Sequence, residues 1–177
     1  GDKLLDKDMD VIVKQITKSL SPKLWVDASH LDAKHGVKVF QEEVMAVTLL
    51  RGSIIVLERS ISFLEKIIKE KQDGGEDASK EEAKLRAIIN ALPAFEESID
   101  KLVRADDKLA RVAIFDADNN PVNDPNNQKK VDQEIAKAKE EFDKAKESSM
   151  KDEPIKAITK YSEAWSHAQM AIKFARK

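Results

Sequence analysis

One long run of helical periodicity constrains this chain more than any other feature. Apolar residues recur every three or four positions from Val37 to Ile68, which places them on one face of a helix. A helix over residues 34–72 would be about 50 Å long at a rise of ~1.5 Å per residue. Between Thr48 and Leu57 it is apolar on nearly every face, so we expect other helices to surround its middle. The sequence therefore predicts a bundle built around one long central helix.

Gly52 lies in the middle of this predicted helix. Glycine lowers helix propensity by roughly 1 kcal/mol relative to alanine, so its presence there needs a reason. We expect it to let a neighbouring helix come close.

Shorter helices are predicted on both sides of the central one. Their apolar residues follow the same spacing, and turn-forming residues separate them. They span about residues 2–20, 79–91, 94–116, 125–148 and 154–176. The segment DGGEDA before residue 79 is predicted to be a loop, and Ser79 with Glu82 matches the capping box that begins many helices.

Pro93 decides how many helices the chain has. Proline removes one backbone hydrogen bond and clashes with the preceding turn, so it kinks or breaks a helix. We expect the helical pattern to stop near Ala91 and to resume after Pro93. The count is then five or six helices, depending on what this proline does.

The composition agrees with an all-α fold. Charged residues make up 36% and hydrophobic residues 41%, whereas aromatic residues are only 5% and glycine and proline number five each. This is the balance of amphipathic helices and not of strands and tight turns. We predict a single helical-bundle domain over residues 1–177. The first residue is not Met, so we expect the chain to be excised from a larger protein.

The charge pattern and the absence of cysteine argue against several classes of protein. Lys and Arg number 31 against 33 Asp and Glu, and the two signs are interspersed, so no basic stripe is available for nucleic acid. The absence of cysteine removes disulfides, thiolate zinc sites and cysteine nucleophiles. The longest apolar stretch, Val44 to Leu57, is cut by Arg51 and Gly52 below the ~18 residues of a spanning helix. We therefore predict neither nucleic-acid binding nor a membrane span.

Asp106 falls on the apolar seam of the helix predicted after Pro93. An unpaired buried charge costs several kcal/mol, so a carboxylate in such a place is either paired or lies at the edge of the seam, in contact with water (the wet edge). We expect Asp106 to lie at the wet edge.

The stretch LWVDASHLDAKHGVKVF, from Leu24 to Phe40, has the composition of a site. Asp27, His30, Asp32 and His35 could supply two imidazoles and two carboxylates to zinc or another divalent ion. Convergence on one ion would need a sharp local bend.

A structural role accounts for the same stretch, and we favour it over metal binding. In this interpretation Trp25 and Leu31 anchor an extended segment to the bundle, and Asp32 caps the central helix. The two histidines then donate hydrogen bonds to carbonyl groups or remain in water.

Other patterns give little support for chemistry. The loop from Asp116 to Asn127 begins like a calcium loop, but Pro121 replaces its glycine and Asn127 its bidentate glutamate. There is no G-x-S-x-G, no glycine-rich phosphate loop, no H-E-x-x-H and no pair of E-x-x-H elements. We therefore predict a protein that is not an enzyme and that uses no cofactor.

The segment EPIKAITKYSEAWSHA, from Glu153 to Ala168, resembles the second half of a tetratricopeptide unit. No 34-residue period recurs upstream, so an array of such repeats is not supported. Tyr161 and Trp165 in this hairpin are the candidate partner-binding residues.

Two segments carry a wider resemblance, namely LWVDASHLDAKHGVKVFQEE and the tail that includes SIDKLVRADDKLARVAIFDA and EIAKAKEEFDKAKESSMKDEPIKAITKYSEAWSHAQMA. Together they resemble a helical domain that recurs in large multidomain secreted or cell-surface proteins of bacteria and archaea. In such relatives a glycine-aspartate-proline turn precedes the last hairpin, and Asn123-Asp124-Pro125 keeps that turn without the glycine. The resemblance implies architecture and location, and no activity.

These observations predict a non-enzymatic structural or interaction module of a larger extracellular or surface-associated protein. It would act as a spacer, in assembly, or by binding a protein partner or neighbouring domains. One alternative is an intracellular module, placed in the cytoplasm, that binds peptides through Tyr161 and Trp165. Another is a divalent-metal-binding helical protein that uses His30 and His35.

Overall fold

Five α-helices form the chain in the computed structural model, which describes the backbone of residues 2–177 and the side chains of residues 9–177. The helices are α1 (Asp2–Ser19), α2 (Val37–Asp73), α3 (Ser79–Asn119), α4 (Gln128–Met150) and α5 (Pro154–Ala175). Single 3-10 turns, η1 (Pro22–Leu24) and η2 (Pro125–Asn127), precede α2 and α4. The predicted all-α class is confirmed.

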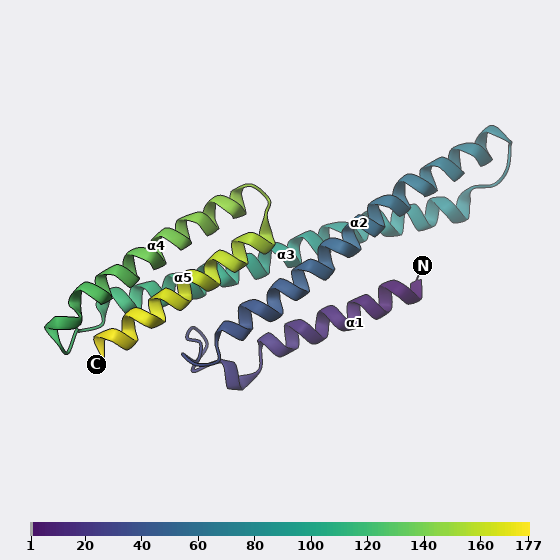
Figure 1. Ribbon diagram of the computed structural model, residues 1–177. Helices are drawn as coiled ribbons and strands as arrows, with labels where there is room; N and C mark the ends of the chain where they lie inside the picture. Colours follow the sequence, from purple (N-terminus) through teal and green to yellow (C-terminus); the bar gives the residue numbers. More distant parts are fainter. Residues whose placement is uncertain (1) are drawn as a thin grey trace.

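The antiparallel pair α2 and α3 is the frame on which the other helices lie (Figure 1). The hairpin of α4 and α5 packs along the C-terminal half of α3, and α5 also contacts α2. Helix α1 packs mainly against α2. The far end of the α2–α3 pair projects beyond α4 and α5. We call residues 55–94 of this pair the arm and the remaining described residues the body.

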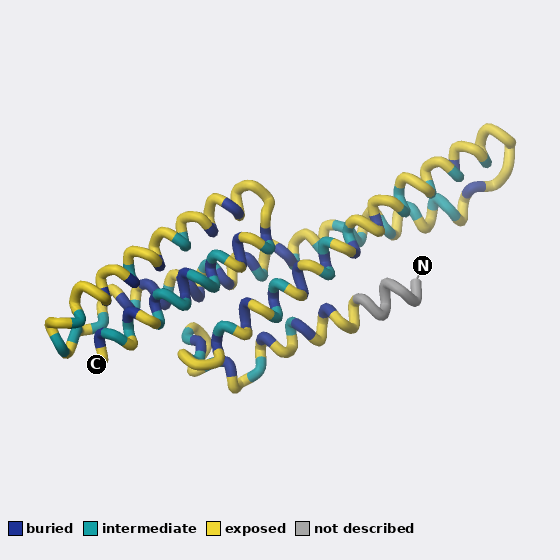
Figure 2. The backbone as a smooth tube through the Cα atoms, viewed as in Figure 1, coloured by how far each residue is buried: buried dark blue, intermediate teal, exposed yellow. Residues whose placement is uncertain are grey.

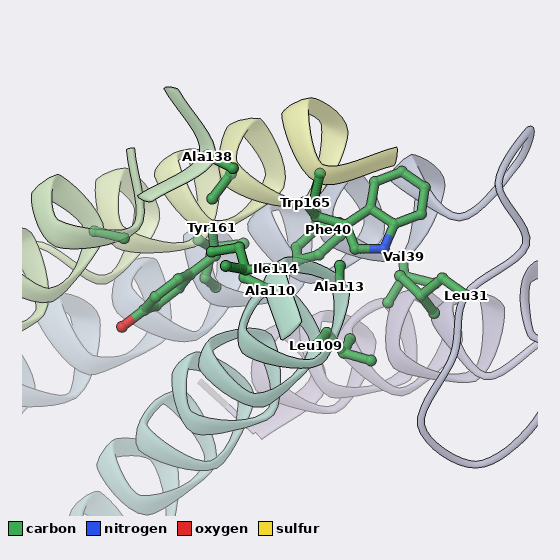
Figure 3. Close-up of a cluster of buried hydrophobic side chains, with 14 of the residues drawn as sticks. Leu31, Val39, Phe40, Leu109, Ala110, Ala113, Ile114, Ala138, Tyr161 and Trp165 are labelled. Atoms are coloured by element: carbon green, nitrogen blue, oxygen red, sulfur yellow. The ribbon is translucent and has the colours of Figure 1, made fainter. Parts of the chain in front are cut away.

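Burial divides the molecule in the same way (Figure 2). In the arm only Leu57, Ile68 and Ala78 are buried, whereas Phe63 is 64% exposed. The main core lies in the body and includes Phe40 and Trp165, whose ring centroids are 6.0 Å apart (Figure 3). Many of the buried residues of α3 and α5 are alanines, whose small side chains allow neighbouring helices to approach closely; they are Ala110, Ala113, Ala117, Ala157, Ala164, Ala168 and Ala171.

Helix α3 runs without a break through Pro93, so the predicted division into helices 79–91 and 94–116 is wrong. Proline removes one backbone donor, which leaves one carbonyl in the preceding turn without its helical partner. Pro93 is exposed, so water can reach this part of the helix. Helix α3 also packs against α2, a contact that helps to keep α3 straight.

Three local predictions also fail. The capping box at Ser79 does not form, because the side chain of Asp77 accepts the backbone N–H of Ser79 at 3.0 Å, while Glu82 bonds Gln72. The central helix begins at Val37 and not at residue 34. Among the described residues, no heavy atom outside the surrounding turns of α2 lies within 4 Å of the position that a Cβ on Gly52 would occupy, so no described helix comes close at this glycine.

Asp106 is fully buried, which contradicts the wet edge predicted for it. It faces Glu43 of α2, which is also buried, and among the described residues only the carboxyl group of Glu43, when protonated, can donate to the Asp106 oxygens. Burial raises the pKa of Glu43 to about 7, and burial together with the Glu43 charge raises the pKa of Asp106 well above its usual range. The two carboxyl groups therefore share a proton near neutral pH, and the protonated one donates to the other.

Candidate partner-binding groove

The segment before α2 forms a tight loop that docks on the body. We call residues 24–36 the docking segment. Trp25 and Leu31 form an antiparallel bridge, and the indole N–H of Trp25 donates to the Ser19 carbonyl at 2.7 Å. Leu31 is buried, in agreement with its predicted role as an anchor.

Gly36 ends the docking segment at a point where three groups meet. A Cβ at this position would lie 2.5 Å from the Leu31 Cβ, 2.7 Å from the Asp32 carbonyl oxygen and 3.0 Å from Cζ2 of Trp165. Real Cβ atoms are not found so close to other heavy atoms, so only glycine fits without a shift of the backbone. The sequence alone does not show this requirement, because Trp165 comes from a distant part of the chain.

His30 links the docking segment to α3. Its Nδ1 lies 2.8 Å from Asp27, and its Nε2 lies 3.2 Å from Asp116 Oδ2. The pKa of His30 is raised, chiefly by its hydrogen bond to Asp27 and further by Asp116. The pKa of Asp27 falls to about 2, because it accepts the backbone N–H of Ser29 and the His30 side chain. Protonated His30 therefore donates to carboxylates on both sides.

Asp32 and His35 form a second, separate pair. The Nδ1 of His35 lies 2.8 Å from Asp32, which also accepts the backbone N–H groups of Lys34 and His35. Asp32 thus caps the turn that precedes α2 and not the helix itself. The backbone N–H of His35 is the main cause of the lowered pKa of Asp32.

The structure does not bring the four candidate metal ligands together. His30 and His35 each bond the aspartate three residues earlier, and His167 bonds Glu134 at 2.6 Å. Within the described residues, no three His, Asp or Glu side chains are placed to hold one ion. The segment from Asp116 to Asn127, which begins like a calcium loop, does not form one loop in the structure, because Asp116 belongs to α3 and Asp124 caps η2.

Tyr161 and Trp165, the candidate partner-binding residues, are core residues. They are 2% and 4% exposed. The ring centroid of Tyr161 lies 5.5 Å from that of Phe142, and Trp165 packs on Phe40 (Figure 3). Their side chains therefore offer almost no surface to a peptide in this conformation.

A groove of about 970 Å³ opens between the docking segment, α3 and α5. This is at the upper end of the range for ligand sites. Its apolar lining includes Val37, Leu109, Val112, Trp165, Met170 and Ile172. Its charged lining consists of His30, Lys34, Asp116, Lys173 and Arg176.

The charges of the groove are mostly of one sign. Asp116, its single carboxylate, is occupied by His30. Across the described part of the chain, no carboxylate lies within 4.0 Å of the cationic groups of Lys34, Lys173 or Arg176. The groove thus combines an apolar lining with three cations that have no acidic partner in the described chain.

Sequence reasoning missed the groove because its lining comes from three distant parts of the chain. The sequence pattern places Asp116 at the border between a predicted helix and a predicted loop, whereas the structure places it on α3, three and seven residues beyond Ala113 and Leu109 on the same helical face. That spacing is the one signal that could have placed these residues together.

Comparison with known proteins does not extend this description. No protein-family model, curated protein or solved structure matches the chain. Over the described residues, none of the helices is both long enough and apolar enough to cross a bilayer.

Proposed function

We propose that this chain is a non-enzymatic interaction module of a larger protein, and that its groove binds a segment of a protein partner. The observation that carries the proposal is the groove itself, where apolar side chains from three distant parts of the chain surround an open space. Apolar surface of this kind, rimmed by polar groups, is typical of sites that bind another molecule.

The chemistry of the lining supports binding more than catalysis. The two titratable groups that meet in the groove, His30 and Asp116, bond each other. General acid or base catalysis needs such a group to be within reach of a substrate proton. In this arrangement both groups instead hold the docking segment against α3, which gives the groove a fixed wall.

The location proposed for the parent protein is extracellular or at the cell surface. The support is the resemblance of the docking segment and the C-terminal helices to domains of secreted and surface proteins. Fractionation of the source cells with an antibody against this chain would test it. Recovery only in the cytosolic fraction would contradict the location without affecting the groove.

Selection from a display library of random 16-residue peptides would test the binding function. We expect the selection to enrich peptides that bind the protein with micromolar affinity. Met170→Glu should weaken the affinity of these peptides at least about tenfold, since a charge at an apolar contact is poorly solvated there. Met170 is 44% exposed, so the variant should fold.

Met150→Glu is the matched control, because Met150 is 81% exposed and does not line the groove. It should leave peptide binding unchanged. A selection that enriches no peptide, or only peptides whose binding survives Met170→Glu, would refute the proposed function.

A further inference from the structure

We infer that the groove recognises protein segments in which carboxylates flank an apolar anchor. This inference rests on the proposed function and specifies the partner class of the same site. It is carried by the charges of the lining, which Lys34, Lys173 and Arg176 supply.

Three lysines at other helix contacts show the alternative arrangement, in which a carboxylate of the chain neutralises the cation. Lys137, Lys139 and Lys160 each lie 2.9 Å or less from a carboxylate oxygen. The full chain carries a net charge of −2, so the excess of positive charge in the groove lining does not reflect a general excess of basic residues. The groove is a local positive patch on a slightly acidic protein.

Helix-dipole stabilisation explains only part of this patch. Lys173 and Arg176 lie at the C-terminal end of α5, where cations are favourable for any helix. Lys34 lies just before the N-terminus of α2, where a cation is unfavourable. Lys34 therefore adds nothing to the stability of α2, and its charge is free to contact a ligand in the groove.

The arrangement of the lining defines the order of groups in the ligand. Lys34 enters from the docking segment, whereas Lys173 and Arg176 enter from α5, so positive charge comes from two different elements. Met170 precedes Lys173 by three residues and shares its helical face. A bound segment that places apolar side chains on Met170 and Val112 therefore brings its flanking residues near cations, which favours Asp and Glu.

Two parallel peptide selections test this inference, one on the wild-type protein and one on the triple variant Lys34→Glu, Lys173→Glu, Arg176→Glu. All three side chains are exposed, so the triple variant should keep its circular dichroism spectrum. We expect wild type to enrich apolar sequences with acidic flanks and the variant to enrich basic ones. A synthetic acidic peptide should bind the variant at least about tenfold more weakly than it binds wild type. Its affinity for wild type should also fall when NaCl is raised to 0.5 M, because salt screens the charges.

The variant Lys69→Glu, Lys80→Glu, Lys84→Glu is the control, because it makes the same change of charge on exposed residues of the arm. It should enrich the same acidic peptides as wild type. Loss of acidic binding in this control would show a response to net charge and would overturn the inference.

The remaining outcomes separate the two proposals. Groove-dependent peptides without acidic flanks would overturn this inference and leave the proposed function standing, whereas no groove-dependent peptide would overturn both. Binding of dodecanoate, in the absence of any acidic peptide, would assign the groove to an anionic lipid and would also overturn the inference.

Discussion

Glu43 and Asp106 are the residues whose chemistry is most sensitive to solution conditions. They face each other at the contact of α2 and α3, where none of the described Lys, Arg or His side chains forms an ion pair with them, and burial raises the pKa of Glu43 to about 7. In an unfolded chain the Glu43 carboxyl would lose its proton near its ordinary pKa of 4.5. Between these values the folded state holds more protons than the unfolded state, so the free energy of unfolding falls as pH rises from about 4.5 to about 7.

Asp106→Asn should remove this loss. The introduced amide donates to Glu43 without needing a shared proton, so we expect the free energy of unfolding to rise by about 1–3 kcal/mol at pH 8. At pH 4.5 the change should be small, because the wild-type pair is protonated there. Urea unfolding at the two pH values measures the difference. Asp100→Asn, an exposed position on the same helix, should change little at either pH, and a destabilised Asp106→Asn at pH 8 would contradict the shared proton.

The burial of Asp106 was readable from the sequence, but its partner was not. Asp106 shares a helical face with the buried Val103 and Ala110, which the spacing shows. Glu43 lies on another helix, and nothing in the local pattern connects the two. A lone carboxylate on an apolar face is expected at the solvent-exposed edge of that face. This prediction is wrong for Asp106, because the carboxyl group of Glu43 supplies the hydrogen bond that burial requires.

At the scale of elements, the docking segment and α2 use glycine in opposite ways. Gly36 is packed against three groups, and Gly52 has open space where a side chain would be. The same substitution should therefore have opposite effects at the two positions.

We expect Gly36→Ala to lower the free energy of unfolding by at least about 2 kcal/mol, because Leu31 and the Asp32 carbonyl cannot both move away. Gly52→Ala should raise it by about 0.5–1 kcal/mol, since alanine is the better helix former and its methyl group would clash with none of the described residues. Chemical denaturation of both variants in parallel provides the measurement. Equal changes, or a stabilised Gly36→Ala, would show that the docking segment adapts more than its contacts indicate.

Helical periodicity predicted the existence of every α-helix. Local sequence rules failed at positions where tertiary packing determines whether a helix continues. The spacing from Val37 to Ile68 was sufficient for α2. Pro93 could not be placed in the same way, because its tolerance depends on exposure and on the packing of α3 along α2. The candidate site was predicted only in part: the loop that holds Leu31 and the His30 region was identified, and the groove beside it was not.

At the scale of the whole molecule, the arm and the body differ in their number of layers. The body packs α1, α4 and α5 on the helix pair, whereas the arm has three buried residues. Local opening costs less where few apolar contacts are broken. Stability should therefore vary along single helices.

Hydrogen–deuterium exchange followed by mass spectrometry should show this variation within α3. Amides of residues 80–94 in the arm should exchange at least about tenfold faster than those of residues 106–117 in the body, because opening of the arm leaves the core intact. Uniform protection along α3 would mean that the helix opens only with the whole molecule. Apolar contact of the arm with a second chain would also slow its exchange, so the measurement is made at several protein concentrations.

The unbroken course of α3 gives the molecule a mechanical property. Its 41 residues form a rod about 60 Å long at ~1.5 Å per residue, with one end in the arm and Leu109, Val112 and Asp116 at the other. A force that turns the tip of the arm acts as a torque on the side of the groove that α3 forms. Pro93, the one position where the rod lacks a backbone donor, is the point at which such a load would bend it first.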